Sequence, residues 1–207
     1  MIRHAVLFVL KDDTTPEQVL RAKEGMASCY FASKVLALDF GDDLRIGDPG
    51  NHDLALTHDH VDRELWDDYN KNETHHRAGE YIKTITNTDR VARVDWEYDG
   101  PESLRGLVRH MALYRWRDGL DDAEKAEVRN ATLALQGTVP SLRWIGMGDD
   151  LLWYPPNHDW IVEAHFDDAD GFKAFADHPA HARVAELIGG ATKPGDTASI
   201  QHRMMTG

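Results

Sequence analysis

Apolar residues occupy both alternating faces of the first stretch of the chain. Within residues 2–10, Val6 and Phe8 share a face with His4, and the positions between them are apolar as well. Residues 107–116 show the same arrangement. A strand that is apolar on both faces is typical of one buried on both sides. We therefore predict a buried strand in each stretch.

The elements expected after these two strands follow in the same order. A helix with Thr15 as its N-cap and Pro16 in its first turn runs to about Tyr30, and its counterpart, capped by Asp121, runs to about Gln136. The pattern then predicts strands at about 34–42 and 141–148, strands at 52–60 and 158–166, helices at 62–71, 73–85, 168–177 and 179–189, and last strands at 90–98 and 197–205. The order β-α-β-β-α-α-β is that of a ferredoxin-like unit.

Residues 107–207 read as a second copy of residues 1–98. Ile2-Arg3-His4-Ala5-Val6-Leu7 recurs as Val108-Arg109-His110-Met111-Ala112-Leu113, an offset of 110 − 4 = 106. The same offset relates His52 to His158, Trp66 to Phe172, Tyr69 to Phe175 and His75 to His181. Solenoid repeats are only about 20–50 residues long, so each copy is a domain-sized unit. We call residues 1–98 the first repeat and residues 107–207 the second repeat, and residues 99–106 are the predicted linker.

The duplication also predicts how the repeats pack. A four-stranded sheet with helices on one face leaves its other face in need of a partner. The expected fold is therefore α+β, with two ferredoxin-like repeats packed sheet to sheet as a pseudo-dimeric α/β barrel that closes with eight strands. The fused pair satisfies this interface internally, which makes a monomer the simplest expectation. Further association through the outer helices is left open.

Composition and charge exclude several classes of partner. The net charge of −13 comes from 36 acidic and 23 basic residues, a balance that repels nucleic-acid backbones. The apolar stretch at residues 5–10 is too short for a membrane span. Cys29 is the only cysteine and has Leu135 as its counterpart, so we expect a small core residue and no disulfide. Nucleic acid and membrane are not expected as partners, and a reducing cytoplasm is the expected location.

Motifs for cofactors and metals are not found in the sequence. No glycine-rich phosphate loop opens a helix, and no serine nucleophile elbow is present. His58-Asp59-His60 places two histidines on one strand face, but no third ligand is evident. We therefore expect neither a cofactor nor a metal ion.

Histidines supply the candidate chemistry. His75, Ala78 and Ile82 follow helical spacing, so His75 points toward the core, as does His181 in the second repeat. A histidine beside a tyrosine hydroxyl can perform acid–base work without a metal. The alternative for both is a buried histidine that hydrogen-bonds to backbone at a helix start. His4 and His110 either line a cavity or are satisfied core residues. A structural hydrogen bond at the start of the third strand is expected for His52 and His158.

Several segments resemble a known family. They are Ile2-Arg3-His4-Ala5-Val6-Leu7-Phe8, Thr15-Pro16-Glu17-Gln18, His52-Asp53-Leu54-Ala55-Leu56 and Phe175-Ala176-Asp177-His178-Pro179-Ala180-His181. They resemble the stress-responsive dimeric α/β-barrel (Dabb) family, whose members are mostly single-domain homodimers of unassigned activity. A few relatives are cofactor-independent polyketide cyclases, in which a helix-borne histidine and a nearby tyrosine act in an apolar cavity. By position, the resemblance implies that His75 and His181 are the helix histidine, that Tyr69 is the tyrosine, and that His4 and His110 are the first-strand histidine. Phe175 stands at the position of the tyrosine in the second repeat and has no hydroxyl.

Two functions follow from this sequence. The first is a small-molecule protein that binds an apolar or carbonyl-bearing ligand; if it is an enzyme, it is a cofactor-independent cyclase or isomerase with lyase-like chemistry. Its candidate catalytic residues are His75, Tyr69 and His4, and its candidate ligand-binding residues are His110, His181, Trp66, Phe172 and Phe175. The second is a non-enzymatic stress-response or structural barrel with no open cavity.

Overall fold

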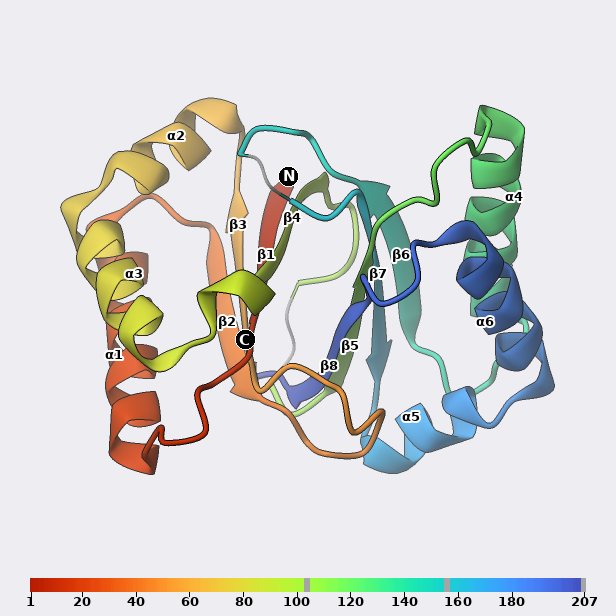
Figure 1. Ribbon diagram of the computed structural model, residues 1–207, viewed down its shortest axis with the longest axis horizontal. Helices are drawn as coiled ribbons and strands as arrows, with labels where there is room; N and C mark the ends of the chain where they lie inside the picture. Colours follow the sequence, from red (N-terminus) through yellow and green to blue (C-terminus); the bar gives the residue numbers. More distant parts are fainter. Residues whose placement is uncertain (103–104, 155–156, 206–207) are drawn as a thin grey trace.

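Two four-stranded antiparallel sheets face each other at the centre of the molecule, with helices on their outer sides (Figure 1). The computed structural model describes residues 1–102, 105–154 and 157–205. The predicted α+β class with two ferredoxin-like units is confirmed. The predicted linker 99–106 includes residues 103–104, which lie outside the described residues, as do the last two residues of the second repeat.

The first repeat contains the first sheet, with strand order β2-β3-β1-β4. Its elements are β1 Ile2–Phe8, α1 Pro16–Ala32, β2 Ala37–Asp42, β3 Leu54–His60, α2 Arg63–Lys71, α3 Glu73–Ile85, a short 3-10 helix Thr88–Arg90 and β4 Ala92–Glu97. The second repeat has the equivalent order, β6-β7-β5-β8. Its elements are β5 Val108–Tyr114, α4 Asp122–Leu133, a 3-10 helix Ala134–Gly137, β6 Trp144–Asp149, β7 Trp160–Phe166, α5 Ala169–Ala176, α6 Pro179–Ala191 and β8 Ala198–Arg203.

The local signals that begin the helices are present as predicted. The Thr15 side chain accepts a hydrogen bond from the backbone N–H of Gln18, whose own side chain reaches back to the Thr15 backbone. Asp121 forms the equivalent capping box with Glu124. These reciprocal bonds satisfy backbone donors that have no partner within the helix. Strand β2 begins later than predicted, because its ladder with β3 starts only at Ala37.

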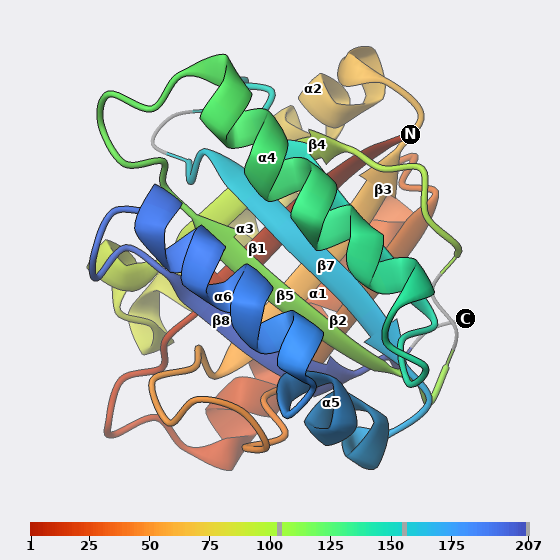
Figure 2. The same ribbon diagram turned by 90° about the vertical axis from the view of Figure 1, so that its right-hand side faces the viewer.

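Helices cover only the outer face of each sheet. In Figure 2, α4 and α6 lie across β7, β5 and β8. The apolar core of each repeat lies between this helix layer and its sheet, and a third core lies between the two sheets. In the described part of the chain, no helix has the length and apolar character needed to cross a membrane.

The interface between the sheets also contains buried charges. Arg3 Nη1 donates to Glu163 Oε1 of the other repeat at 2.6 Å, and Arg3 Nε donates to Asp59 Oδ1 at 2.7 Å. Arg109 Nε lies 3.0 Å from the same Glu163 oxygen, and its Nη1 lies 3.0 Å from Asp39 Oδ2. Burial raises the pKa of the Glu163 carboxyl, but Arg3 and Arg109 outweigh it and hold that pKa far below its usual range. The two repeats are therefore joined by ionic as well as apolar contacts.

The edges of the two sheets are joined by loops. We call residues 43–53 and the described residues 150–154 and 157–159 the crossing loops, because each donates backbone hydrogen bonds to the last strand of the other repeat. The backbone N–H of Leu44 donates to Gln201 at 2.7 Å, and that of Leu151 donates to Asp95 at 2.7 Å. The predicted closure of an eight-stranded barrel is thus made by loop contacts and one isolated bridge, between Asp43 and His202, and not by continuous strand ladders.

Candidate functional site

A cavity of about 550 Å³ lies between the sheet and the helices of the first repeat. This volume falls in the range of small-molecule sites. Its walls combine apolar side chains with a cluster of rings. The lining includes Val6, Phe8, Met26, Leu56 and Ile82, the polar or aromatic residues His4, His58, Trp66, Tyr69, His75 and Arg93, and Tyr154 from the second repeat.

The strand register brings the polar groups of this cavity together. His4 on the central strand β1 lies opposite His58 on β3 and opposite Asp95 on β4. Residues paired across antiparallel strands project to the same face, so all three side chains point to the helix side of the sheet. The site is therefore assembled by three neighbouring strands, with α2 and α3 above them.

His4 and Asp95 form a close pair. His4 Nδ1 lies 2.5 Å from Asp95 Oδ1, which also accepts a hydrogen bond from Trp66 Nε1 at 2.9 Å. Asp95 is completely buried, and burial raises the pKa of its carboxyl. His4 and the hydrogen-bond donors outweigh burial, so the net pKa lies below its usual value. A carboxylate bound to Nδ1 leaves Nε2 as the proton-accepting nitrogen of a neutral His4.

Aromatic contacts extend from this pair across the cavity. The His58 ring lies 4.7 Å from His4 and 4.2 Å from Tyr69, and Tyr69 lies 4.3 Å from His75, all between ring centroids. Burial and the nearby His4 lower the pKa of His75 to about 4 and hold that of His58 well below its usual value. Burial, together with the adjacent Cys29 thiol, raises the pKa of the Tyr69 hydroxyl. His58 and His75 are therefore neutral near pH 7, and Tyr69 keeps its proton.

The structure places four of the predicted site residues around one cavity: His4, Trp66, Tyr69 and His75. The alternative considered for His75 is also seen, since its Nδ1 lies 3.4 Å from the backbone oxygen of Asn70. His52 makes its predicted structural bond, with Nε2 2.9 Å from the Arg90 oxygen. Cys29 is a buried core residue, as expected.

The other four predicted residues lie in the second repeat, away from this cavity. Phe172 and Phe175 belong to the second core and pack against Phe166 with ring centroids 5.7 and 5.1 Å apart. The His181 ring lies tilted against Phe175, with centroids 4.4 Å apart, and its Nδ1 lies 3.1 Å from the Ala176 oxygen. Phe166 is the counterpart of His60, so the second repeat has an apolar phenyl ring where the first repeat has a polar imidazole.

His110 lacks the carboxylate partner of its counterpart His4. Its Nδ1 lies 2.8 Å from Nε2 of Gln201, the residue that corresponds to Asp95. Burial, with the nearby His181, lowers the pKa of His110 to about 4. A neutral amide cannot stabilise an imidazolium as a carboxylate does. At these two equivalent positions, only the histidine of the first repeat is paired with a carboxylate.

The second repeat nevertheless contributes to the first-repeat site through its crossing loop. The Trp153 ring meets the Trp66 ring edge-on at 5.6 Å, and Tyr154 lines the cavity. Asn157 Nδ2 donates to Asp95 Oδ2 at 3.2 Å. The cavity and its buried carboxylate are therefore completed by residues from both halves of the chain.

Sequence reasoning missed Asp95, Arg93, Asn157 and Tyr154. The offset of the repeats carries a signal for the first two, since it pairs Asp95 with Gln201 and Arg93 with Ser199, and a charge is present in only one copy each time. Asn157 and Tyr154 carry no such signal, because their role depends on where the crossing loop lies. Among the residues the structure describes, no group of three or more histidine, cysteine or acidic side chains is placed to hold a metal ion.

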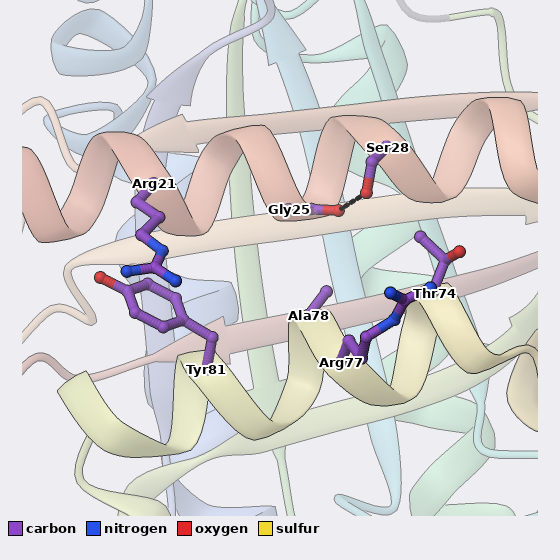
Figure 3. Close-up of a pocket in the computed structure, with 7 residues that line it drawn as sticks. All are labelled: Arg21, Gly25, Ser28, Thr74, Arg77, Ala78 and Tyr81. Atoms are coloured by element: carbon purple, nitrogen blue, oxygen red, sulfur yellow. Dashed lines mark hydrogen bonds between the residues drawn. The ribbon is translucent and has the colours of Figure 1, made fainter.

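A second hollow, of about 390 Å³, lies on the outer surface between α1 and α3 (Figure 3). Arg21 stacks over the Tyr81 ring at 4.5 Å at one end, and Gly25 faces Ala78 in the middle. Neither a histidine nor a carboxylate lines it. In contrast to this hollow, the inner cavity is lined by histidines.

Comparisons with known proteins agree with the internal duplication. A family model for the stress responsive A/B barrel domain matches residues 2–98 and again 108–194. An uncharacterized protein of Streptomyces coelicolor is 30% identical over 77 residues, which span 36% of this chain and 79% of that protein. The structure of an anthrone oxidase-like protein is 16% identical, with a TM-score of 0.72, covering 99% of this chain and 91% of its own. A dimeric ferredoxin-like protein of unknown function from Thermobifida fusca is 29% identical over 52% of this chain and 99% of its own, with a TM-score of 0.44.

Proposed function

This chain belongs to the stress-responsive A/B barrel domain family and carries the domain twice; from that premise we propose that its first repeat binds a small carbonyl compound and moves a proton on it. One observation carries the proposal. His4, which is paired with Asp95, lines a cavity of about 550 Å³ whose walls combine apolar and polar side chains. Such a cavity has room for a small ligand, and the pair supplies a base.

His4 is the proposed base. Its Nε2 takes a proton from the carbon next to the ligand carbonyl, and the Asp95 carboxylate stabilises the imidazolium that forms. The proton then returns to another carbon or to oxygen, which gives an isomerisation. Alternatively, the carbanion attacks a second carbonyl of the same ligand, whose C=O π bond opens to an alkoxide, and the alkoxide takes the proton back from His4, which gives an aldol-type cyclisation. Neither route consumes an oxidant or a reductant, so no cofactor is required.

Tyr69 and His75 are proposed to orient the ligand. A Tyr69 hydroxyl that keeps its proton can donate to the ligand carbonyl oxygen, where negative charge develops. With a pKa of about 4, His75 is a weaker base than an ordinary histidine, so it suits a hydrogen-bonding role better than proton abstraction. The second repeat, with its packed aromatic core, fits the structural role considered for the whole chain.

Ligand binding is tested first by thermal unfolding. Small carbonyl compounds and polyketide-like phenols are screened against the full chain, because a ligand that binds only the native state raises its stability. Compounds that stabilise the protein are then incubated with it in D₂O, and exchange of protons next to the carbonyl is followed by NMR.

His4→Gln and His110→Gln form a matched pair for this assay. We expect His4→Gln to slow exchange by about 100-fold or more, whereas His110→Gln keeps the wild-type rate. The proposal is wrong if no compound stabilises the protein, or if His4→Gln exchanges the ligand as fast as wild type.

A further inference from the structure

Arg93 contributes a cation to the wall of the cavity. It lies on β4 two residues before Asp95, so both side chains project to the same face. Among the described residues, no carboxylate lies within ion-pair distance of Arg93, and its buried Nε has no hydrogen-bond partner. Its guanidinium carbon lies 5.2 Å from the centre of the Tyr154 ring.

Arg93 is half-buried, whereas the guanidiniums of Arg3 and Arg109 are fully buried and each is paired with carboxylates. Arg3 is paired with Asp59 and Glu163, and Arg109 is paired with Asp39 and Glu163. Leaving a buried donor or charge without a partner is costly. The chain has 36 acidic residues, yet none of those that the structure describes forms an ion pair with Arg93.

Arg93 is also specific to the repeat that has the cavity. The offset of 106 residues places Ser199 at the equivalent position, where its hydroxyl donates to Asn51 at 2.7 Å. Lys83 also lines the cavity, but it is paired with Glu80 at 2.6 Å. Among the described residues that line the cavity, Arg93 is therefore the lysine or arginine that has no carboxylate partner.

We infer that the ligand of this cavity is an organic acid, whose carboxylate pairs with Arg93 while its carbonyl-bearing end lies at His4. This inference rests on the proposed function and specifies its substrate class. A planar guanidinium matches a carboxylate with two parallel hydrogen bonds, and one cation matches one negative charge better than the two of a phosphate. In the strand register Arg93 lies opposite Val6, two residues along β4 from Asp95, which lies opposite His4. Two residues of a strand span about 7 Å, so we expect about this distance between the carboxylate of the ligand and the ligand carbon that reacts at His4.

A matched pair of probes tests the charge. 4-Acetylbenzoate carries a carboxylate and an enolisable methyl ketone on opposite sides of one ring, and 4-acetylbenzamide is its neutral counterpart. We expect the wild-type protein to bind the acid about 10- to 100-fold more tightly than the amide. Arg93→Gln removes this difference and leaves the affinity for the amide within about twofold. Arg183→Gln, which removes an exposed charge on α6, keeps the wild-type preference.

Two further arms keep the inference falsifiable. Arg93→Lys keeps the charge but loses the two-bond geometry, so we expect an intermediate preference; this variant decides the question if Arg93→Gln does not fold. 4-Acetylphenyl phosphate tests the number of charges, and tighter binding of the phosphate than of the benzoate overturns the carboxylate assignment.

The outcomes separate this inference from the proposed function. If the wild-type protein binds acid and amide equally and exchanges the methyl protons of both, the anion inference is wrong and the proposed function stands. If neither probe binds, both are wrong. If the acid binds through Arg93 but its methyl protons do not exchange, the acid site is supported and the proposed proton transfer is contradicted.

Discussion

Asn157 Nδ2 in the second repeat lies 3.2 Å from Asp95 Oδ2 in the first, so the carboxylate of one repeat is held by an amide of the other. The reciprocal contact joins Asn51 Nδ2 to Gln201 Oε1 at 2.8 Å. The geometry is shared by the two repeats, but only one of the two acceptors carries a charge. The pseudo-symmetric framework therefore supports a chemically asymmetric pair of sites.

This pair of amides supplies the first prediction. Asn157→Ala and Asn51→Ala each remove buried hydrogen bonds, and each should lower the free energy of unfolding by about 1–3 kcal/mol in urea titrations. Only Asn157→Ala should also slow ligand proton exchange, because only Asp95 orients the proposed base. Equal effects of the two variants on exchange would contradict a positioning role for Asn157.

Asp95→Asn tests the carboxylate itself. The variant replaces the charge by an amide, as in the second repeat, and leaves the side-chain shape almost unchanged. We expect the exchange rate to fall by about 100-fold or more, because the imidazolium of His4 loses its counter-charge. The measurement is the rate of ligand proton exchange at saturating ligand. Gln201→Ala, at the equivalent position of the second repeat, is the control. Unchanged exchange in Asp95→Asn would remove Asp95 from the mechanism.

Tyr69→Phe separates the hydroxyl from the ring. Phe175 occupies the equivalent position in a well-packed core, so we expect the free energy of unfolding to change by no more than about 1 kcal/mol. Exchange should nevertheless be slowed by about 10-fold or more, since the ligand carbonyl loses its donor. Unfolding curves and exchange rates on the same sample check both statements. Full activity in Tyr69→Phe would show that the carbonyl is held elsewhere.

Acid should destabilise the fold through its buried histidines. Burial and the nearby His4 lower the pKa of His60 to about 4, against an ordinary value of 6.5. Between these two pH values the unfolded chain binds a proton at this position and the native protein does not. The contribution is therefore fully present above about pH 6.5 and is lost as the pH falls toward 4, at up to about 1.4 kcal/mol per pH unit for one histidine.

His60→Phe isolates this effect, because Phe166 is its counterpart in the second repeat. We expect the dependence of unfolding free energy on pH between 6.5 and 4 to become shallower by up to about 1.4 kcal/mol per unit. His58 loses a partner at 2.8 Å in this variant, which lowers stability at every pH, so the slope is the informative quantity. A slope equal to that of wild type would place the titrating groups elsewhere.

Glu163→Ala tests the charges between the sheets. It leaves Arg3 and Arg109 without a shared carboxylate in a buried interface, and removing one partner of such a network costs about 3–5 kcal/mol. Chemical denaturation measures the loss. A variant within about 1 kcal/mol of wild type would mean that Asp59 and Asp39 suffice.

Much of the fold could be predicted from the pattern of residues. The strand that carries His4 has apolar positions on both faces, and the caps Thr15 and Asp121 fix where two helices begin. These are local signals repeated at a constant offset, so each element is indicated twice. The closure of the barrel was predicted less well, because it depends on the path of loops that carry few periodic residues.

The site was predicted in part for a related reason. His4, Tyr69 and His75 come from a family resemblance and from helical spacing, and the structure brings them to one cavity. Asp95 stands on the last strand without a motif around it, and its importance appears only when the register places it opposite His4. Asn157 was harder still to predict from the sequence, because a contact between the two repeats leaves no pattern within either repeat.

The crossing loops separate two tasks that a homodimer must assign to one sequence. In a dimer of identical chains, any substitution in the loop that covers a site appears over both sites at once, and any change in the site appears beneath both loops. Here Tyr154 of one crossing loop lines the cavity of the first repeat, while Leu44 and Ile46 of the other pack against the core of the second repeat. Each loop can change in sequence without the other. Substitutions in the loop that contributes Tyr154 can therefore adapt to a ligand, while those in the other loop are limited only by its packing.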